Sequence, residues 1–101
     1  MPPAKANQTA LSEIAYTEKF KKDYSNLKPD IRKHVDNALV DLLKNPRPKS
    51  LRLKKYNGHS NPYIYAVHAT SNHSHKISLE INGNQIILRR VGTHKVVDTA
   101  P

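Results

Sequence analysis

The spacing of the apolar residues changes abruptly at residues 45–48, and this change constrains the fold more than any other feature of the sequence. Before it, apolar side chains recur at helical intervals, which predicts two amphipathic helices over about 17–27 and 29–44. After it, they alternate with a period of two, which is typical of strands packed on one side. Pro46 and Pro48 separate the two regions, because proline removes a backbone donor and clashes with the preceding helical turn.

The predicted elements combine into an α+β layout. A short strand over 12–16 precedes the helices, and a basic connector or irregular strand over 49–56 follows them. Further strands are predicted over 63–68, 77–81 and 86–91. Asn82-Gly83 is a hairpin signal between the last two strands, and 95–101 form a short tail. Because each helix has one apolar side, we expect a two-helix hairpin on one face of a mostly antiparallel, twisted sheet, in the order β-α-α-β-β-β. The other sheet face is then left to solvent or to a ligand.

Length and composition exclude several classes of protein. The 101 residues allow a single domain over 12–101, preceded by a flexible N-terminal arm over 1–11. The sequence contains no cysteine, which excludes a disulfide scaffold, a thiolate metal site and a cysteine nucleophile. No apolar run approaches the ~18 residues of a membrane span, and the first residues lack the hydrophobic stretch of a signal peptide. We therefore expect a cytoplasmic protein.

The positive charge is concentrated in the second half of the chain. Residues 1–44 carry 8 basic and 6 acidic side chains, a net charge of +2, whereas residues 45–101 carry 9 and 2, a net charge of +7. Five of the six histidines also lie in the second half. A field of this sign attracts polyanions. The alternative is that a small basic domain gains only solubility from its charge, but acids then usually alternate with the bases.

Five stretches of the sequence together resemble a known family. They are YTEKFKKDYSNL, PDIRKHVDNALVDLLKNP, LKKYNG, PYIYAVH and IILRRVGTH. In their order and spacing, over about residues 13–98, they resemble the RelE/ParE superfamily of toxins from bacterial type II toxin–antitoxin systems. The ending VGTH is most similar to the YafQ branch, in which a histidine follows the last strand.

The resemblance implies a function and a set of partners. Most RelE-like members are mRNA endoribonucleases that act on the ribosome and so inhibit translation. The implied partners are an acidic antitoxin protein, the ribosome and mRNA, with no membrane and no cofactor. Two alternatives stay open: ParE-like members inhibit DNA gyrase without catalysis, and the chain could be an RNA-binding domain without catalysis.

Candidate catalytic residues follow from what RNA cleavage requires. A base must take the 2′-OH proton, cations must stabilise the phosphorane, and an acid must protonate the leaving 5′ oxygen. His94, in VGTH, resembles the YafQ-type histidine and is the candidate general acid; an exposed loop histidine is the alternative. His68 ends the strand over 63–68 and is a second acid–base candidate. Arg89 is predicted to face the ligand, because alternation places Arg90 with the core residues.

Candidate RNA-binding residues cluster in the basic connector. Lys54 and Lys55 resemble the family's phosphate-binding loop, although a solvated loop would have the same sequence. Tyr56 is a candidate for stacking on a base, and His59 is a third possible acid–base group. The motif HSH at 73–75 could chelate a metal, but no carboxylate lies near it in the sequence, so we predict no metal site. The chain departs from the RelE pattern at Ile64, where many members have arginine, and in its tail, which lacks the usual aromatic residue.

Overall fold

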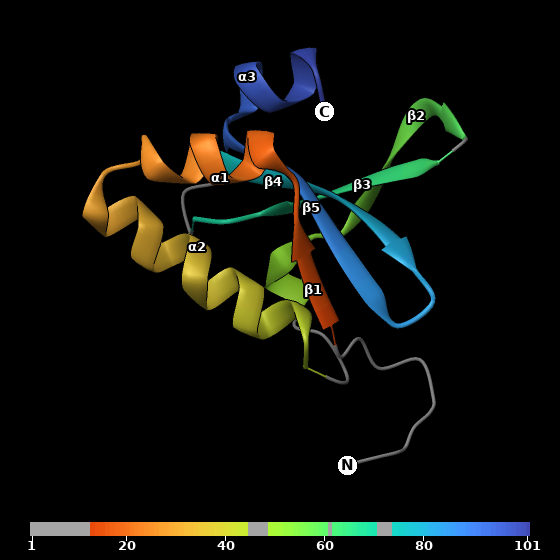
Figure 1. Cartoon of the computed structure of the whole chain (residues 1–101), viewed down its shortest axis with the longest axis horizontal. Coiled ribbons are helices and arrows are strands. Elements are labelled where there is room, and N and C mark those ends of the chain that lie inside the picture. The colour runs from red at the N-terminus through yellow and green to blue at the C-terminus, as the bar shows by residue number, and fades with distance from the viewer. Residues whose placement is uncertain (1–12, 45–48, 61, 71–73) are drawn as a thin grey trace.

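The structure is a computed structural model that describes residues 13–44, 49–60, 62–70 and 74–101. Its elements follow one another along the chain (Figure 1). They are β1 (Glu13–Tyr16), α1 (Glu18–Ser25), α2 (Pro29–Leu42), a 3₁₀ turn η1 (Lys49–Leu51), β2 (Lys54–Ser60), β3 (Tyr63–His68), β4 (His75–Asn82), β5 (Gln85–Thr93) and α3 (His94–Thr99). None of the helices in this described part is long and apolar enough to cross a membrane.

The five strands form one sheet in the order β1-β5-β4-β3-β2. β1 pairs with β5 in parallel, and the other neighbours are antiparallel. The predicted α+β class and the mostly antiparallel sheet are therefore confirmed. Asn82-Gly83 forms the predicted turn between β4 and β5, where Gly83 has a φ of +63°, a left-handed conformation that glycine adopts without strain.

The two long helices begin where local chemistry favours them. Thr17 caps α1, because its hydroxyl accepts a hydrogen bond from the Phe20 backbone N–H at 3.1 Å. α2 begins at Pro29, whose fixed φ suits a first helical position and whose missing N–H costs nothing there. The Tyr24 hydroxyl of α1 donates to Asp36 of α2 at 2.6 Å and links the two helices.

The helices cover one face of the sheet and form the main core with it (Figure 1). Buried apolar side chains of both layers make up this core: Phe20, Val35, Ala38, Leu42, Leu51, Val67, Ala69, Ile77, Leu79, Ile86, Leu88 and Val91. The apolar stripes that predicted the helices are the faces turned to this core. The helix hairpin thus does not cover the opposite face of the sheet.

That opposite face is covered in part by a third helix, which the sequence did not predict. Residues 94–99 form α3 instead of part of the expected tail, and α3 packs against β4 and β5. Val97 is fully buried, and the Ser78 hydroxyl donates to the Pro101 carbonyl at 3.1 Å. Six residues are too few for a helix to form by propensity alone, so the burial of Val97 stabilises it.

The connector also differs from its prediction. The expected irregular segment over 49–56 divides into η1 and β2, and β2 continues to Ser60. β2 pairs with β3 at Lys54↔Ala66 and Lys55↔Tyr65, and its register then shifts before Ser60. Gly58, with a φ of +84°, lies inside this irregular strand, so Asn57-Gly58 does not end it. The predicted arm over 1–11 lies outside the described residues.

Candidate functional site

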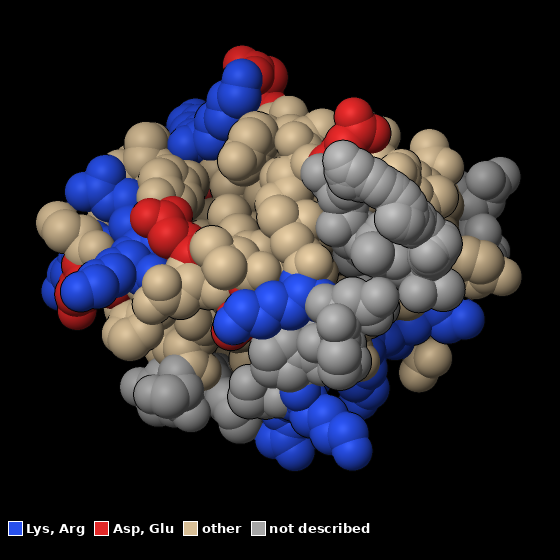
Figure 2. Space-filling model, turned by 90° about the horizontal axis from the view of Figure 1, so that it is seen from below, with Lys and Arg blue, Asp and Glu red and all other residues tan. Residues whose placement is uncertain are grey.

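A basic cleft of about 550 Å³ opens between β2, β3, β4 and α3. The residues that line it are Arg52, Lys54, Lys55, Tyr56, Asn57, Ala66, His68, Lys76 and Asp98. Four of these side chains are basic, and Asp98 is the acidic one. A concave surface with this excess of positive charge attracts a polyanion such as a nucleic-acid backbone. Figure 2 shows another face of the molecule, on which lysine and arginine side chains project at the edge of the protein.

Two histidines lie together beside this cleft. The rings of His68 and His94 are stacked, with centroids 5.3 Å apart and an interplanar angle of 30°. The sheet register explains their meeting: His68 pairs with Lys76, and Lys76 pairs with Gly92, two residues before His94. Nε2 of His94 is buried and makes no hydrogen bond within the described structure. That atom is therefore not committed to a protein hydrogen bond, and in the free chain it is covered by protein.

A third histidine stands next to the pair. His75 pairs with Thr93 across β4 and β5, and its Nδ1 lies 2.7 Å from the Ser74 hydroxyl. Burial lowers the pKa of His75 below its ordinary value, and the charge of His94 lowers it further. A neutral His75 beside the pair keeps additional positive charge away from it.

Asp98 joins three elements inside the cleft. One of its carboxylate oxygens accepts a hydrogen bond from the Tyr56 hydroxyl at 2.6 Å and from Lys76 Nζ at 2.8 Å. These two hydrogen bonds lower the pKa of Asp98, so that it is a carboxylate at neutral pH. Burial, and then the hydrogen bond to Asp98, raise the pKa of Tyr56, which keeps its proton. Lys76 Nζ also lies 5.4 Å from the centre of the Tyr56 ring.

Arg52 has an unusual backbone at the edge of the cleft. Its φ is +54°, in the left-handed region that a non-glycine residue rarely adopts. Its exposed side chain lines the basic cleft and also a neighbouring cleft of about 590 Å³ on the α2 side. Such backbone conformations often occur at functional sites.

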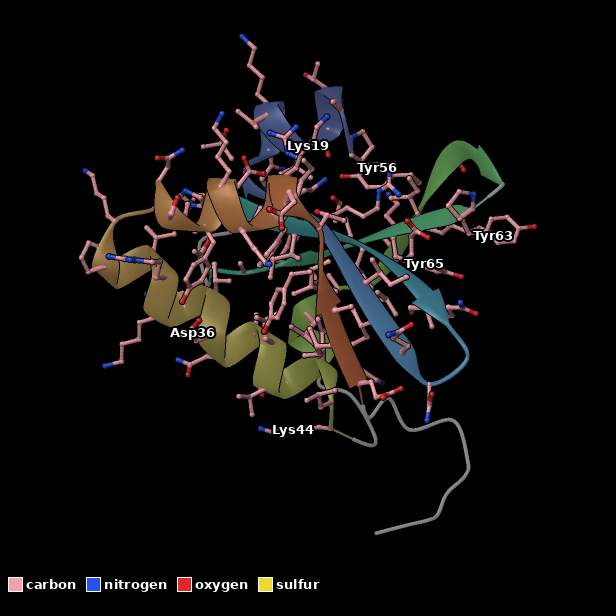
Figure 3. The ribbon with its side chains drawn as sticks, in the orientation of Figure 1. Lys19, Asp36, Lys44, Tyr56, Tyr63 and Tyr65 are labelled. Carbon is pink, nitrogen blue, oxygen red and sulfur yellow. The ribbon has the colours of Figure 1, made fainter. Side chains whose placement is uncertain are left out.

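The structure brings most of the predicted site residues together. Lys54, Lys55, Tyr56 and His68 line one cleft, and His94 is stacked on His68. Tyr56 is held by Asp98 and lies on the side of the sheet toward α3 (Figure 3), so its hydroxyl is a hydrogen-bond donor in the cleft. The side chain of His59 lies outside the described residues.

The tyrosines of β3 differ from one another, although their spacing of two residues puts both on one face of the strand. Tyr65 is partly buried and packs on the core, whereas Tyr63 is 50% exposed. Figure 3 shows Tyr63 pointing outward near the end of the β2–β3 hairpin. Lys55 Nζ lies 4.4 Å from the centre of the Tyr63 ring. Tyr63 lies too near the end of the sheet for the helices to cover it.

Arg89 occupies a different place from the histidine pair. It forms an ion pair with Glu80, and its Nε donates to the Pro101 carbonyl at 3.1 Å. It lines a separate cleft of about 450 Å³, which shares Asp98 with the basic cleft. The β4–β5 register shifts at this point: Leu79 pairs with Leu88 but Ser78 with Arg90, which makes Arg89 the extra residue of a bulge.

Arg90 does not lie with the core residues as the alternation predicted, because the bulge at Arg89 shifts the alternation. Val91 is the buried core residue, and Arg90 pairs with Ser78, whose hydroxyl faces the C-terminal segment. The Arg90 guanidinium binds Asp23 of α1 through Nε at 2.6 Å and Nη2 at 3.2 Å. This hydrogen-bonded carboxylate raises the pKa of Arg90. The two adjacent arginines therefore have separate ion-pair partners, Glu80 and Asp23, and both also donate to carbonyl groups of the C-terminal segment.

Sequence reasoning missed three residues of the site, Arg52, Lys76 and Asp98, and considered His75 only as a metal ligand. The alternation of β4 places Lys76 on the face opposite Ile77, but only the strand register shows that it lies beside His68. Asp98 follows His94 by four residues, a helical spacing that would have indicated one face had the tail been read as a helix. Among the described residues, no group of three or more His, Cys, Asp or Glu side chains could hold a metal ion.

Comparison with known proteins identifies the fold. No family model and no curated protein matches the sequence. Several solved structures do match. The RelB–RelE antitoxin–toxin complex from Methanococcus jannaschii contains a chain 29% identical to this one, with a TM-score of 0.62 over 86% of this chain and 99% of that one.

Two Escherichia coli complexes have the same fold at lower identity. The chain from the DinJ–YafQ toxin–antitoxin complex is 15% identical, with a TM-score of 0.68 over 84% of this chain and 94% of that one. The chain from the intact RelBE toxin–antitoxin complex is 18% identical, with a TM-score of 0.63 over 80% and 94%. These similarities show that the chain has the RelE fold.

Proposed function

We propose that this chain, which has the RelE fold, is the toxin of a type II toxin–antitoxin pair and cleaves mRNA on the ribosome. The observation that carries the proposal is the stacked pair of His68 and His94 beside a cleft lined by four basic side chains. The similar structures are solved as toxin–antitoxin complexes, which supports an antitoxin as the protein partner.

The histidine pair can supply both proton transfers of RNA cleavage. In this reaction the 2′ oxygen attacks the neighbouring phosphorus, the bond to the 5′ oxygen breaks, and a 2′,3′-cyclic phosphate is left. His68 takes the 2′-OH proton, and His94 gives a proton to the departing 5′ oxygen. Two imidazolium charges in contact would repel, which favours a pair with one neutral and one protonated ring.

The basic residues of the cleft supply the electrostatic part. The phosphorane carries more negative charge on its oxygens than the starting phosphodiester. Lys54, Lys55 and Arg52 line the cleft beside His68 and would bind the scissile and flanking phosphates. Arg89 is engaged by Glu80 and Pro101, so we assign it a role in holding the C-terminal segment rather than in contacting RNA.

The proposal is tested by inducing the chain in bacterial cells and mapping the 5′ ends of ribosome-bound mRNA. We expect growth arrest together with new mRNA ends, and recovery when the acidic antitoxin is produced. A supercoiling assay with purified gyrase runs in parallel. Arrest with inhibited gyrase and intact mRNA would assign the chain to the ParE-like alternative, and RNA binding without arrest or cleavage would leave only an RNA-binding domain.

A further inference from the structure

We propose that Tyr56 and Lys76 form a phosphate-binding subsite for RNA, and that in the free protein the carboxylate of Asp98 fills this subsite. The inference deepens the proposed function and rests on it only for the identity of the polyanion. A phosphate oxygen and a carboxylate oxygen accept hydrogen bonds from the same donors, so an internal carboxylate can hold the position of an external phosphate.

The geometry around Asp98 is that of an anion site. An O–H donor and an N–H donor from two different strands converge on a single oxygen, Asp98 Oδ1, at 2.6 and 2.8 Å. The Lys76 side chain is only 16% exposed, and its Nζ lies over the Tyr56 ring, so its position is well defined. Both donors and the anion line the same cleft as His68.

Asp98 itself is the group that an incoming strand can replace. Its side chain is 43% exposed, and it is the one acidic residue among the described residues that line the cleft. α3 does not depend on it for anchoring, because Val97 is fully buried and the Arg90 side chain donates to the Ala100 carbonyl. The carboxylate can therefore turn away while the helix stays in place.

The consequence is an exchange of anions when RNA binds. A phosphate that enters the subsite gains the Tyr56 and Lys76 hydrogen bonds and displaces Asp98. The carboxylate lowers the affinity of the cleft for RNA, since it offsets one positive charge and must be displaced. Removal of its charge should therefore strengthen binding, whereas loss of an ordinary structural contact would weaken it.

The test uses binding of a short 2′-O-methyl oligoribonucleotide, which lacks the attacking hydroxyl and cannot be cleaved. Asp98→Asn keeps the size of the side chain and an oxygen acceptor but removes the charge. We expect its affinity to rise roughly three- to tenfold at low salt, with a logarithmic salt dependence steeper by about 0.7, the value for one further phosphate contact. In the Lys76→Ala background most of this gain should disappear.

Glu18→Gln is the matched control. It changes the net charge equally, but Glu18 pairs with Lys21 on the exposed surface of α1, outside the cleft. The inference is overturned if Asp98→Asn binds no more tightly than Glu18→Gln, or if its gain is unchanged without Lys76. A gain seen only with a glutamate-rich peptide would also overturn it, because the subsite would then serve an acidic protein.

A second measurement does not depend on any variant. Inorganic phosphate added to the unmodified chain should shift the amide resonances around Tyr56, Lys76 and Asp98 more than those of α1. Shifts spread evenly over the surface would contradict the subsite. If His94 is dispensable for cleavage while Asp98→Asn still tightens binding, the proposed reaction is wrong and the subsite stands. If His94 is required for cleavage and Asp98→Asn does not tighten binding, only the subsite is wrong.

Discussion

Replacement of His94 by glutamine tests most directly whether this histidine is the general acid of RNA cleavage. The glutamine amide keeps a hydrogen-bonding group near the position of Nε2, which is buried beside His68, but it cannot transfer a proton. A positioned general acid contributes roughly 10²–10⁴-fold to a rate, which corresponds to about 2.7–5.5 kcal/mol of transition-state stabilisation. We therefore expect mRNA cleavage on ribosomes to slow by that factor.

The same variant should leave the fold almost unchanged. α3 is anchored by the buried Val97, whereas His94 contributes one ring contact at the start of the helix. We expect the free energy of unfolding to change by less than about 1 kcal/mol, as measured by chemical denaturation. Binding of the uncleavable oligoribonucleotide should also stay near that of the parent, because the phosphate contacts come from other residues.

The dependence of the rate on pH separates proton transfer from a positioning role. The parent should show a bell-shaped profile, since one ring must be neutral and the other protonated. His94→Gln should lose the fall in rate at high pH, which reports deprotonation of the acid. His34→Gln, a change of an exposed histidine on α2, is the control and should keep the parent profile. A folded His94→Gln variant that cleaves within a few-fold of the parent would refute the assignment.

Four further outcomes follow from the structure. Lys54→Ala with Lys55→Ala should weaken oligoribonucleotide binding and reduce its logarithmic salt dependence by about 1.4, the value for two phosphate contacts. Asp23→Ala should lower the free energy of unfolding by about 1–3 kcal/mol in denaturant titrations, because it leaves the largely buried Arg90 guanidinium without its carboxylate. Gly92→Ala should keep or slightly raise the melting temperature, since the added Cβ would meet side-chain atoms of α3 at ordinary distances of 3.5–3.9 Å. The lowered pKa of His75 means that the folded state binds its proton less readily than the unfolded state, so unfolding titrations should show stability falling as pH drops below about 6.5, and His75→Gln should reduce this dependence.

Binding of the proposed acidic antitoxin would test the charge distribution. The second half of the chain carries a net charge of +7, so an acidic antitoxin should bind there and lose affinity as salt screens the attraction. Calorimetry of the complex at low and high salt measures this. An affinity that does not change with salt would show that apolar contacts dominate the interface.

The sequence by itself determined the two helices and the strands over 63–68, 77–81 and 86–91. The spacing of apolar residues predicts these elements. Side chains two residues apart in a strand, or three to four apart in a helix, face the same core whatever the rest of the chain does. The spacing of apolar residues did not predict β2 and α3. β2 is an edge strand with an irregular register, and α3 is a short helix whose formation depends on burying Val97 against β4 and β5.

The same distinction holds for the residues of the site. His94, His68 and the lysines at 54 and 55 could be named from the sequence, because a resemblance preserves residue types and their order along the chain. Only the tertiary structure decided that His68 is stacked on His94, and that Tyr56 and Lys76 both donate a hydrogen bond to Asp98. The physical reason is that strand register brings together residues tens of positions apart, and register is set by pairing, turns and bulges across the whole sheet, which no local pattern records.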